Sequence, residues 1–357
     1  MSIFNTTKVD HLKQPMFLGE PVNIARYDTV KYNQFEKLTD KALGFFWRPQ
    51  EVELSKDSKD FKKLPYEQQQ IFTLPLARNI VLDSVQGRGP SEAFASICSL
   101  PEIEVWLKTW EFFETIHSRS YTHIIRNIYP DPSVVFDTIT EIQEIVDCAK
   151  DITKEYDELI SLIGQKDWRE PLELKEQIWR TLNAINALEG IRFYASFAIF
   201  WAFAEQGLMT GNANIIKLIC RDENLHLAGT QQMLKLLVKE DEDFARIAVE
   251  EADYVASMFK DVVDQEKAWA KYVFSRGSII GLNQEILCLY IDHIAAKRAQ
   301  AIGIQGFKQI PNPLPWTMKW IGGSEVQVAP QESEIVSYRT TGVKNTMTKE
   351  SFKGYKL

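Results

Sequence analysis

The segment Trp110-Glu-Phe-Phe-Glu114-Thr-Ile-His117-Ser-Arg-Ser-Tyr121-Thr-His123 decides the fold. A helix turns about 100° per residue, so side chains three, four and seven positions apart return to the same face. Glu114, His117 and Tyr121 have these spacings. A carboxylate, an imidazole and a phenol are therefore predicted to point inward together from one helix.

A second Glu-x-x-His motif, Glu223-Asn-Leu-His226, occurs later in the chain, and the two copies use two of its five histidines. Two further acids lie in apolar helical segments. Asp83 is near the C-terminal end of its predicted helix, where an acidic group opposes the helix dipole. Glu189 is surrounded on the helical wheel by large apolar residues, where an unpaired carboxylate would be costly. We therefore expect the carboxylate of Glu189 to bind a cation.

Two helices that each offer a carboxylate, and two that each offer Glu-x-x-His, are typical of a bundle that binds two metal ions. The predicted ligands are Asp83, Glu114, His117, Glu189, Glu223 and His226. Four carboxylates and two imidazoles can hold two ions, with the glutamates free to bridge. A single Glu-x-x-His is more often a solvated helix face. The alternative for Asp83 and Glu223 is an ion pair with Arg88 or Arg221.

Composition excludes several classes of function. The formal charge of -8 gives no broad basic field, so neither nucleic acid nor an anionic membrane is an expected partner. The most apolar run, Phe193 to Phe203, is too short to span a bilayer and is predicted to be a fully buried helix. No secretory signal is visible, and the four separated cysteines favour reduced core thiols in a cytoplasmic protein.

The chain reads as a helical body with two extensions. Residues 1–30 are predicted to be an N-terminal arm, residues 31–320 the helical domain, and residues 321–357 a mobile C-terminal tail. Apolar periodicity predicts helices over residues 32–43, 65–86, 102–129, 133–163, 172–208, 212–238, 241–274 and 282–303, with a shorter helix in the nineties. The one candidate hairpin lies near residues 320–330.

Tyr121 follows His117 by one turn, so its phenol should lie near one metal ion. The plain interpretation is a core tyrosine that hydrogen-bonds to a carboxylate. A metal pair that activates O2 could instead oxidise the phenol to a radical, which would survive only away from water. Phe193, Phe197 and Ile219 share the ligand-bearing faces and could enclose the phenol, although by themselves they are ordinary core residues.

Six stretches together resemble a known family. They are the opening segment, Phe-Phe-Trp47-Arg-Pro, Leu-Asp83-Ser-Val-Gln-Gly-Arg, Leu-Glu189-Gly-Ile-Arg-Phe-Tyr-x-Ser-Phe, Arg-Asp-Glu223-x-Leu-His and Val-Gln-Val-Ala-Pro-Gln-Glu332, with Tyr338 beyond them. They occur in the order, and over nearly the whole length, of the small radical-generating subunit of class I ribonucleotide reductase. The resemblance implies an all-α, ferritin-like helical bundle with extra helices and a dimetal carboxylate site in its core.

The resemblance also implies roles. The six predicted ligands would hold two iron ions, an oxygen-bridged Fe-O-Fe pair when oxidised, with manganese as the other metal that suits them. Tyr121 would store the radical. Trp47 and Asp222 would carry the oxidising equivalent outward by way of His117, and Glu332 and Tyr338 would continue that path in the tail. Without the family, Trp47 would be a core aromatic, Asp222 a salt-bridge acid and Tyr338 an ordinary tail tyrosine.

The implied activity is that of a ribonucleoside-diphosphate reductase, an oxidoreductase that reduces ribonucleotides to deoxyribonucleotides for DNA replication. The chain would act as a homodimer with a large catalytic subunit, O2 and an electron donor, and its tail would dock on the large subunit. Family tails are often acidic, whereas this one carries Lys344, Lys349, Lys353 and Lys356.

Two other functions suit a dimetal bundle. A stand-alone diiron oxidase or oxygenase would need a substrate cavity beside the metals, and the bulky aromatics near Glu189 disfavour one. An iron-storage bundle would have no use for Trp47 or Tyr338.

Overall fold

A computed structural model describes residues 6–165 and 171–322, and all of its named elements are helices. The elements in order are η1 (His11–Lys13), α1 (Asn33–Gly44), η2 (Pro49–Glu51), α2 (Ser55–Lys63), α3 (Tyr66–Gln86), α4 (Gly89–Phe94), α5 (Pro101–Ile128), α6 (Ser133–Phe136), η3 (Ile139–Glu141), α7 (Gln143–Gly164), α8 (Pro171–Ala187), η4 (Leu188–Arg192), α9 (Phe193–Ala204), α10 (Thr210–Glu240), α11 (Glu242–Glu250), α12 (Ala252–Phe274), α13 (Gln284–Ala301), η5 (Pro315–Thr317) and α14 (Met318–Ile321). The described residues contain two isolated β-bridges and no named strand. The predicted all-α class is confirmed.

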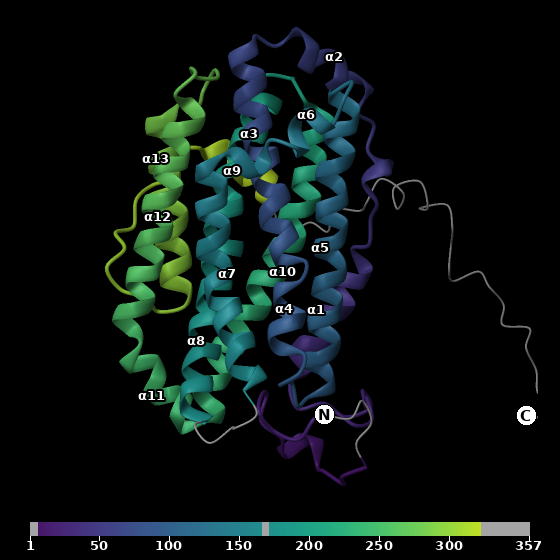
Figure 1. The fold of residues 1–357 in the computed structure, drawn as a ribbon, viewed down its shortest axis with the longest axis vertical. Helices are drawn as coiled ribbons and strands as arrows, with labels where there is room; N and C mark the ends of the chain where they lie inside the picture. The colour runs from purple at the N-terminus through teal and green to yellow at the C-terminus, as the bar shows by residue number, and fades with distance from the viewer. Residues whose placement is uncertain (1–5, 166–170, 323–357) are drawn as a thin grey trace, which may run out of the picture.

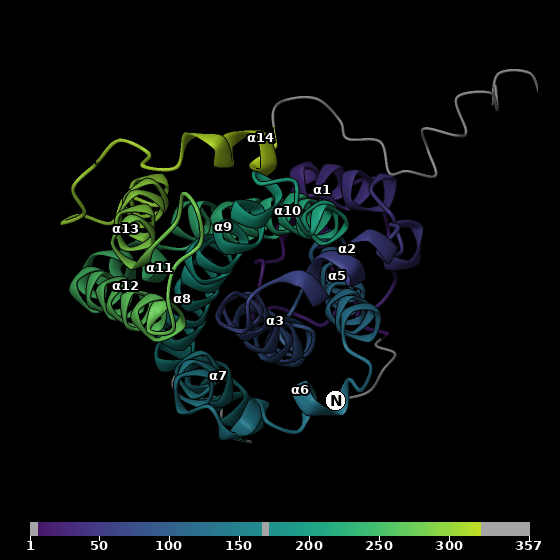
Figure 2. The same ribbon diagram turned by 90° about the horizontal axis from the view of Figure 1, so that it is seen from above.

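The long helices run roughly parallel to the long axis of the molecule (Figure 1). Seen from above in Figure 2, α3 lies near the middle and packs against α5, α7 and α9. Helix α10 packs against α5, α8 and α9, and α1 and α2 cover α5 and α10 from outside. Helices α12 and α13 pair with each other on the far side of α8 and α9. The four segments that carry the predicted ligands therefore face one interior.

Local sequence sets where the helices that carry these residues begin and end. Helix α5 starts with Pro101 in its first turn and stops at Tyr129, whose backbone is extended before Pro130. Helix α3 starts after Pro65 and ends at Gly87, and it contains Pro75, which has no N–H to donate. Nearly every residue of α9 is buried, as predicted for the Phe193 to Phe203 run.

The N-terminus of α10 is fixed by a residue from another helix. Asp57 of α2 accepts hydrogen bonds from the backbone N–H groups of Gly211 (3.0 Å) and Asn212 (2.5 Å). These N–H groups belong to the first turn and have no partner within the helix. The approach is close, because a Cβ on Gly211 would lie 2.4 Å from the carbonyl oxygen of Glu53. This contact anchors the helix that carries Glu223 and His226.

The predicted helix over residues 172–208 is interrupted at the candidate site. Helices α8 and α9 are separated by the π-helical segment η4, and Glu189 lies inside it. A π turn accommodates an extra residue and is frequent at functional sites. The apolar periodicity on either side did not reveal it, because the chain stays helical and buried throughout.

Two other predicted helices are also divided. Residues 241–274 form α11 and α12, separated at Glu251, whose carboxylate makes two hydrogen bonds of 2.7 Å with Arg180 of α8. Residues 133–163 form α6, η3 and α7. Where a hairpin was expected, Met318–Ile321 is helical, so that prediction is wrong there. Residues 323–330 lie outside the described ranges.

One helical stretch, Pro171–Ala204, has the length and composition to cross a membrane, but 94% of its most apolar window is buried inside the protein. It is therefore placed as a core helix. All four cysteines are free thiols, and three of them are buried. Cys98 lies outside any helix, in a β-bridge with Phe17. The proposed division into arm, domain and tail stays a prediction.

Candidate metal centre

Four helical segments bring all six predicted ligands into one buried cluster. Asp83 comes from α3, Glu114 and His117 from α5, Glu189 from η4, and Glu223 and His226 from α10. None of these residues is more than 1% exposed. Glu114 and His117 share a face of α5 because they are three residues apart, and the same spacing aligns the second pair on α10.

The cluster has two halves that share their glutamates. Asp83, Glu114, His117 and Glu223 offer ligand atoms that all lie within 4.8 Å of one another. A second set, in which Glu189 and His226 join the same two glutamates, meets the same limit. Glu114 and Glu223 therefore lie between the halves.

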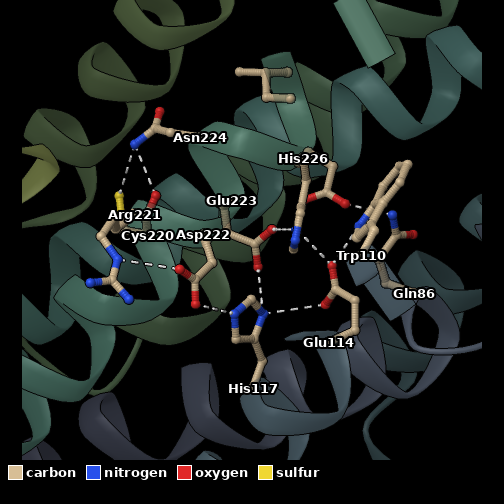
Figure 3. A network of polar contacts seen from close by, with 12 residues as sticks. Gln86, Trp110, Glu114, His117, Cys220, Arg221, Asp222, Glu223, Asn224 and His226 are labelled. Atoms are coloured by element: carbon tan, nitrogen blue, oxygen red, sulfur yellow. Dashed lines mark hydrogen bonds and ion pairs between the residues drawn. The ribbon is translucent and has the colours of Figure 1, made fainter. Parts of the chain in front are cut away.

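The individual distances show how the histidines face the shared acids (Figure 3). His117 Nδ1 lies 3.3 Å from Glu114 Oε2 and 3.2 Å from Glu223 Oε1. His226 Nδ1 lies 2.9 Å from Glu114 Oε1 and 3.0 Å from Glu223 Oε2. Glu189 Oε2 is slightly further from His226 Nδ1, at 3.9 Å. Each imidazole thus points one nitrogen at the same pair of carboxylates.

The polar atoms that converge here fit metal ions. The buried atoms without a hydrogen-bond partner include both oxygens of Asp83, one oxygen each of Glu114, Glu189 and Glu223, and Nδ1 of His117. Buried polar atoms are rarely left without partners, and buried carboxylates cost most. Oxygen-rich sites with one imidazole per ion suit iron or manganese. The donor set therefore fits two such ions.

The carboxylates and imidazoles perturb one another strongly. Burial raises the pKa of Asp83, and the charge of Glu114 raises it further. Burial and the charge of Glu223 raise the pKa of Glu189 in the same way. Four acids in a dry core must be neutralised by protons or by metal cations.

Burial lowers the pKa of a histidine, whereas it raises the pKa of a carboxylic acid. Burial lowers the pKa of His226, but the charge of Glu114 and the hydrogen bonds of Glu114 and Glu223 outweigh it and raise the pKa to about 9. The pKa of His117 is also raised, because the carboxylates around it outweigh its burial. For Glu223, the neighbouring carboxyl group of Glu189 and the charge of His117 outweigh burial and lower the pKa. Metal ions would displace these protons.

Two residues that the sequence did not single out support the ligands. Trp110 Nε1 donates to Glu114 Oε1 at 2.9 Å, and its ring stacks on that of His226 with centroids 5.3 Å apart. Gln86 Nε2 donates to Glu189 Oε1 at 2.5 Å. Helical spacing could have indicated both, because Trp110 precedes Glu114 by four residues and Gln86 follows Asp83 by three.

Tyr121 is fully buried one turn beyond His117. The side-chain amide of Asn79 donates to its phenol oxygen at 3.2 Å. Burial and the charge of Asp83 raise the pKa of Tyr121 well above its usual value. The phenol is therefore protonated at neutral pH and shielded from solvent.

A chain of hydrogen-bonding groups leads away from the cluster. Trp47 Nε1 donates to Asp222 Oδ2 at 2.7 Å, and the same oxygen lies 3.2 Å from His117 Nε2. Arg221 Nε contacts the other oxygen of Asp222 at 3.3 Å. Arg221 thus pairs with Asp222, and the ion pairs of Glu223 among the described residues are with His117 and His226, so the predicted pair of Glu223 with an arginine is not formed. Within the described residues, neither oxygen of Asp83 has a hydrogen-bond partner, so Arg88 does not hydrogen-bond to this carboxylate.

The remaining predicted residues are placed only in part. Phe193, Phe197 and Ile219 are fully buried, and the two phenylalanine rings stack with centroids 5.9 Å apart. Their enclosure of Tyr121 stays a prediction. Glu332 and Tyr338 lie outside the described residues.

Fold and cluster together define a helical-bundle protein whose core is built to hold two metal ions between carboxylates. Comparison with known families is more specific, because residues 25–312 match the family described as ribonucleotide reductase, small chain. The chain belongs to that family, as its resemblance implied. Small chains of ribonucleotide reductase are the radical-generating component of the enzyme.

Relatives align along their full length. The chain is 47% identical to ribonucleoside-diphosphate reductase subunit beta of Buchnera aphidicola (subspecies Schizaphis graminum) and to ribonucleoside-diphosphate reductase 1 subunit beta of Escherichia coli O157:H7, with 99% of each chain covered. It is 38% identical to subunit beta of Enterobacteria phage T4, again over 99% of both chains. The ribonucleotide reductase R2 subunit of Clostridium botulinum has a similar structure, with a TM-score of 0.78 at 26% identity over 90% of this chain and 98% of the other.

Proposed function

We propose that this small chain generates a radical on Tyr121 with a metal pair and O2, and passes the oxidising equivalent to the large subunit of a ribonucleoside-diphosphate reductase. The observation that carries the proposal is the buried cluster of four carboxylates and two imidazoles, whose unpartnered atoms converge one helical turn from Tyr121. Full-length relatives named as subunit beta of that reductase support it.

The cofactor we propose is a pair of iron ions, and manganese suits the same ligands. Asp83 and His117 would belong to one ion, Glu189 and His226 to the other, and Glu114 and Glu223 to both. When bound, the metals would react with O2 and supply the oxidising power that removes an electron from Tyr121. Because oxygen ligands dominate both halves, metal supply in the cell would decide between iron and manganese.

The protein's own residues protect and position the phenol. The core keeps Tyr121 from water, and Asn79 fixes its oxygen through the 3.2 Å hydrogen bond. Because the phenol is protonated at neutral pH, oxidation must remove a proton together with the electron. We propose that Phe193, Phe197 and Ile219 complete the dry surroundings that preserve the radical.

We propose that the oxidising equivalent leaves the cluster by way of His117, Asp222 and Trp47, and continues through Glu332 and Tyr338 of the tail. The hydrogen bond from Trp47 to Asp222 and the contact between Asp222 and His117 support the first part. The tail would bind the large subunit, and an external electron donor would restore the reduced metals.

We also propose a cytoplasmic homodimer. Leu43, Phe46 and Phe112 lie together on α1, its C-terminal end and α5, and each is at least 41% exposed. The rings of Phe46 and Phe112 stack with centroids 6.1 Å apart. Exposed apolar groups that gather in this way are typical of protein interfaces.

Reconstitution tests the central proposal. Metal-free protein should be supplied with Fe(II), or with Mn(II), and O2, and its electron paramagnetic resonance (EPR) spectrum recorded. A tyrosyl signal in the wild type that disappears in Tyr121→Phe would support the proposal. No organic radical with either metal would overturn it, and a signal that survives in Tyr121→Phe would move the radical to another residue.

A further inference from the structure

Behind Glu189, on the side away from His226, two buried polar side chains form a hydrogen-bonded series. Tyr156 of α7 donates from its hydroxyl to Gln86 Oε1 at 2.9 Å. Gln86, the last residue of α3, donates from Nε2 to Glu189 Oε1 at 2.5 Å. Gln86 is fully buried and Tyr156 only 3% exposed. Three segments of the fold thus meet at one carboxylate oxygen.

Each hydrogen bond in this series can run in only one direction. A metal-binding Glu189 is an ionised carboxylate that can only accept hydrogen bonds, so the N–H side of the Gln86 amide must face it. The carbonyl side then faces Tyr156, whose hydroxyl must donate. Burial raises the pKa of Tyr156 well above its usual value, so the hydroxyl retains the proton it needs.

The ring of Tyr156 is held in place by the start of α4. A Cβ on Gly89 would lie 2.5 Å from the ring carbon that bears the hydroxyl and 2.6 Å from the next carbon. Real side chains do not approach so closely, so only glycine leaves room for the ring. The hydroxyl is therefore aimed by packing, and it in turn fixes the Gln86 amide.

The Gln86 amide fixes the orientation of the Glu189 carboxylate. Its Oε1 is occupied by Gln86, while its Oε2 has no hydrogen-bond partner and faces His226 Nδ1 at 3.9 Å. Without the amide, the carboxylate could rotate about its side-chain bonds and offer either oxygen. Partners of this kind orient metal ligands, and losing one typically weakens metal affinity about 10–100-fold.

We propose that Gln86 and Tyr156 are positioning residues that hold Glu189 Oε2 toward the metal ion shared with His226. The inference rests on the proposed two-metal site and assigns a separate role to residues that touch neither ion. It predicts an effect confined to one half of the cluster, because neither Gln86 nor Tyr156 bonds to Asp83 or His117 in the described structure.

Titration of the full-length, metal-free protein with Mn(II) in the absence of O2 tests the proposal. EPR measures both the free Mn(II) and the spin coupling between two bound Mn(II) ions. The wild type should bind two ions and show a coupled pair. Gln86→Met, which keeps the volume, should bind one ion normally and the other about 10–100-fold more weakly, with an isolated Mn(II) spectrum at low loading. Tyr156→Phe should act in the same direction, by about 10-fold or less.

The double variant and a control separate positioning from general damage. Because Tyr156 acts through Gln86, adding Tyr156→Phe to Gln86→Met should cause no further loss. Tyr129→Phe removes a phenol that bonds to Thr73 away from the site, and it should bind both ions normally. Additive losses, equal weakening of both ions or unchanged binding would overturn the inference. A wild type that binds fewer than two ions would overturn the two-metal proposal itself.

Discussion

The indole N–H of Trp47 lies 2.7 Å from Asp222 Oδ2, the same oxygen that approaches His117 Nε2 at 3.2 Å. One carboxylate oxygen therefore joins an aromatic ring between α1 and η2 to a predicted metal ligand on α5. Trp47 and His117 are fully buried, and Asp222 is 2% exposed. In such buried, low-dielectric surroundings a hydrogen bond is electrostatically stronger than it would be in water.

Trp47→Phe keeps the aromatic volume and removes only the donor. We expect it to preserve metal binding and the Tyr121 radical, and to lower turnover with the large subunit at least 100-fold, since the outward path is cut. EPR spin counting and a nucleotide reduction assay on the same samples measure both quantities. Trp179→Phe is the control, because its Nε1 has no hydrogen-bond partner and it lies on α8 away from the site. Normal turnover in Trp47→Phe would show that the path does not use the indole.

Tyr338→Phe tests the distant end of the proposed path. Tyr338 is not one of the six predicted metal ligands, so the yield and lifetime of the Tyr121 radical should equal those of the wild type. Turnover with the large subunit should be abolished, because phenylalanine cannot exchange a proton and an electron as tyrosine does. A Tyr338→Phe variant that still turns over would exclude Tyr338 as a relay, whereas loss of the radical would indicate an effect on the core.

Metal binding should release protons. The pKa of His226 is raised from its ordinary 6.5 to about 9, so near pH 7 the imidazole carries a proton that a metal must displace. Each displaced proton should raise the apparent Mn(II) affinity about tenfold per pH unit between pH 7 and 9. Calorimetric titrations in buffers of different ionisation enthalpy count the protons. Heats that do not depend on the buffer would contradict the prediction.

The stability of the metal-free protein should decrease as pH rises, whereas the metal affinity should increase. The pKa of His226 is higher in the folded state than in the unfolded state. Protonation of His226 therefore stabilises the fold, and this contribution is fully present below pH 6.5. That contribution is lost as pH rises through about 9. Denaturant unfolding of metal-free protein at pH 6 and pH 9 measures the difference. His226→Gln should show a smaller decrease than the wild type.

Sequence spacing predicted the centre of this site because both Glu-x-x-His motifs lie within single helices. Within a helix, three residues always return to one face, so Glu114 and His117 had to lie together. The π-helical geometry around Glu189 and the break at Glu251 depend on contacts between helices, including the ion pair with Arg180. Local periodicity contains no such information.

The residues around the ligands were harder to predict for the same reason. Gln86 and Trp110 have helical spacings to Asp83 and Glu114, yet that spacing alone does not distinguish a supporting side chain from a core or surface residue. Tyr156 has no local relation to any ligand, since it reaches Gln86 from α7. Only the assembled fold brings it to the cluster.

Phe197→Ala tests whether the apolar core preserves the radical. Removing this fully buried ring should lower the free energy of unfolding by about 3–5 kcal/mol and open space that water or small reductants can enter. We expect the Tyr121 radical to form but to decay several-fold faster in EPR time courses, with the largest effect when hydroxyurea is added. Phe259→Ala is the matched control, because Phe259 is equally buried but lies on α12, which carries no site residue. Phe259→Ala should lose a similar amount of stability but keep the wild-type rate of radical decay, which would assign the faster decay in Phe197→Ala to the surroundings of Tyr121. If both variants lose the radical equally fast, general loosening of the core explains the decay.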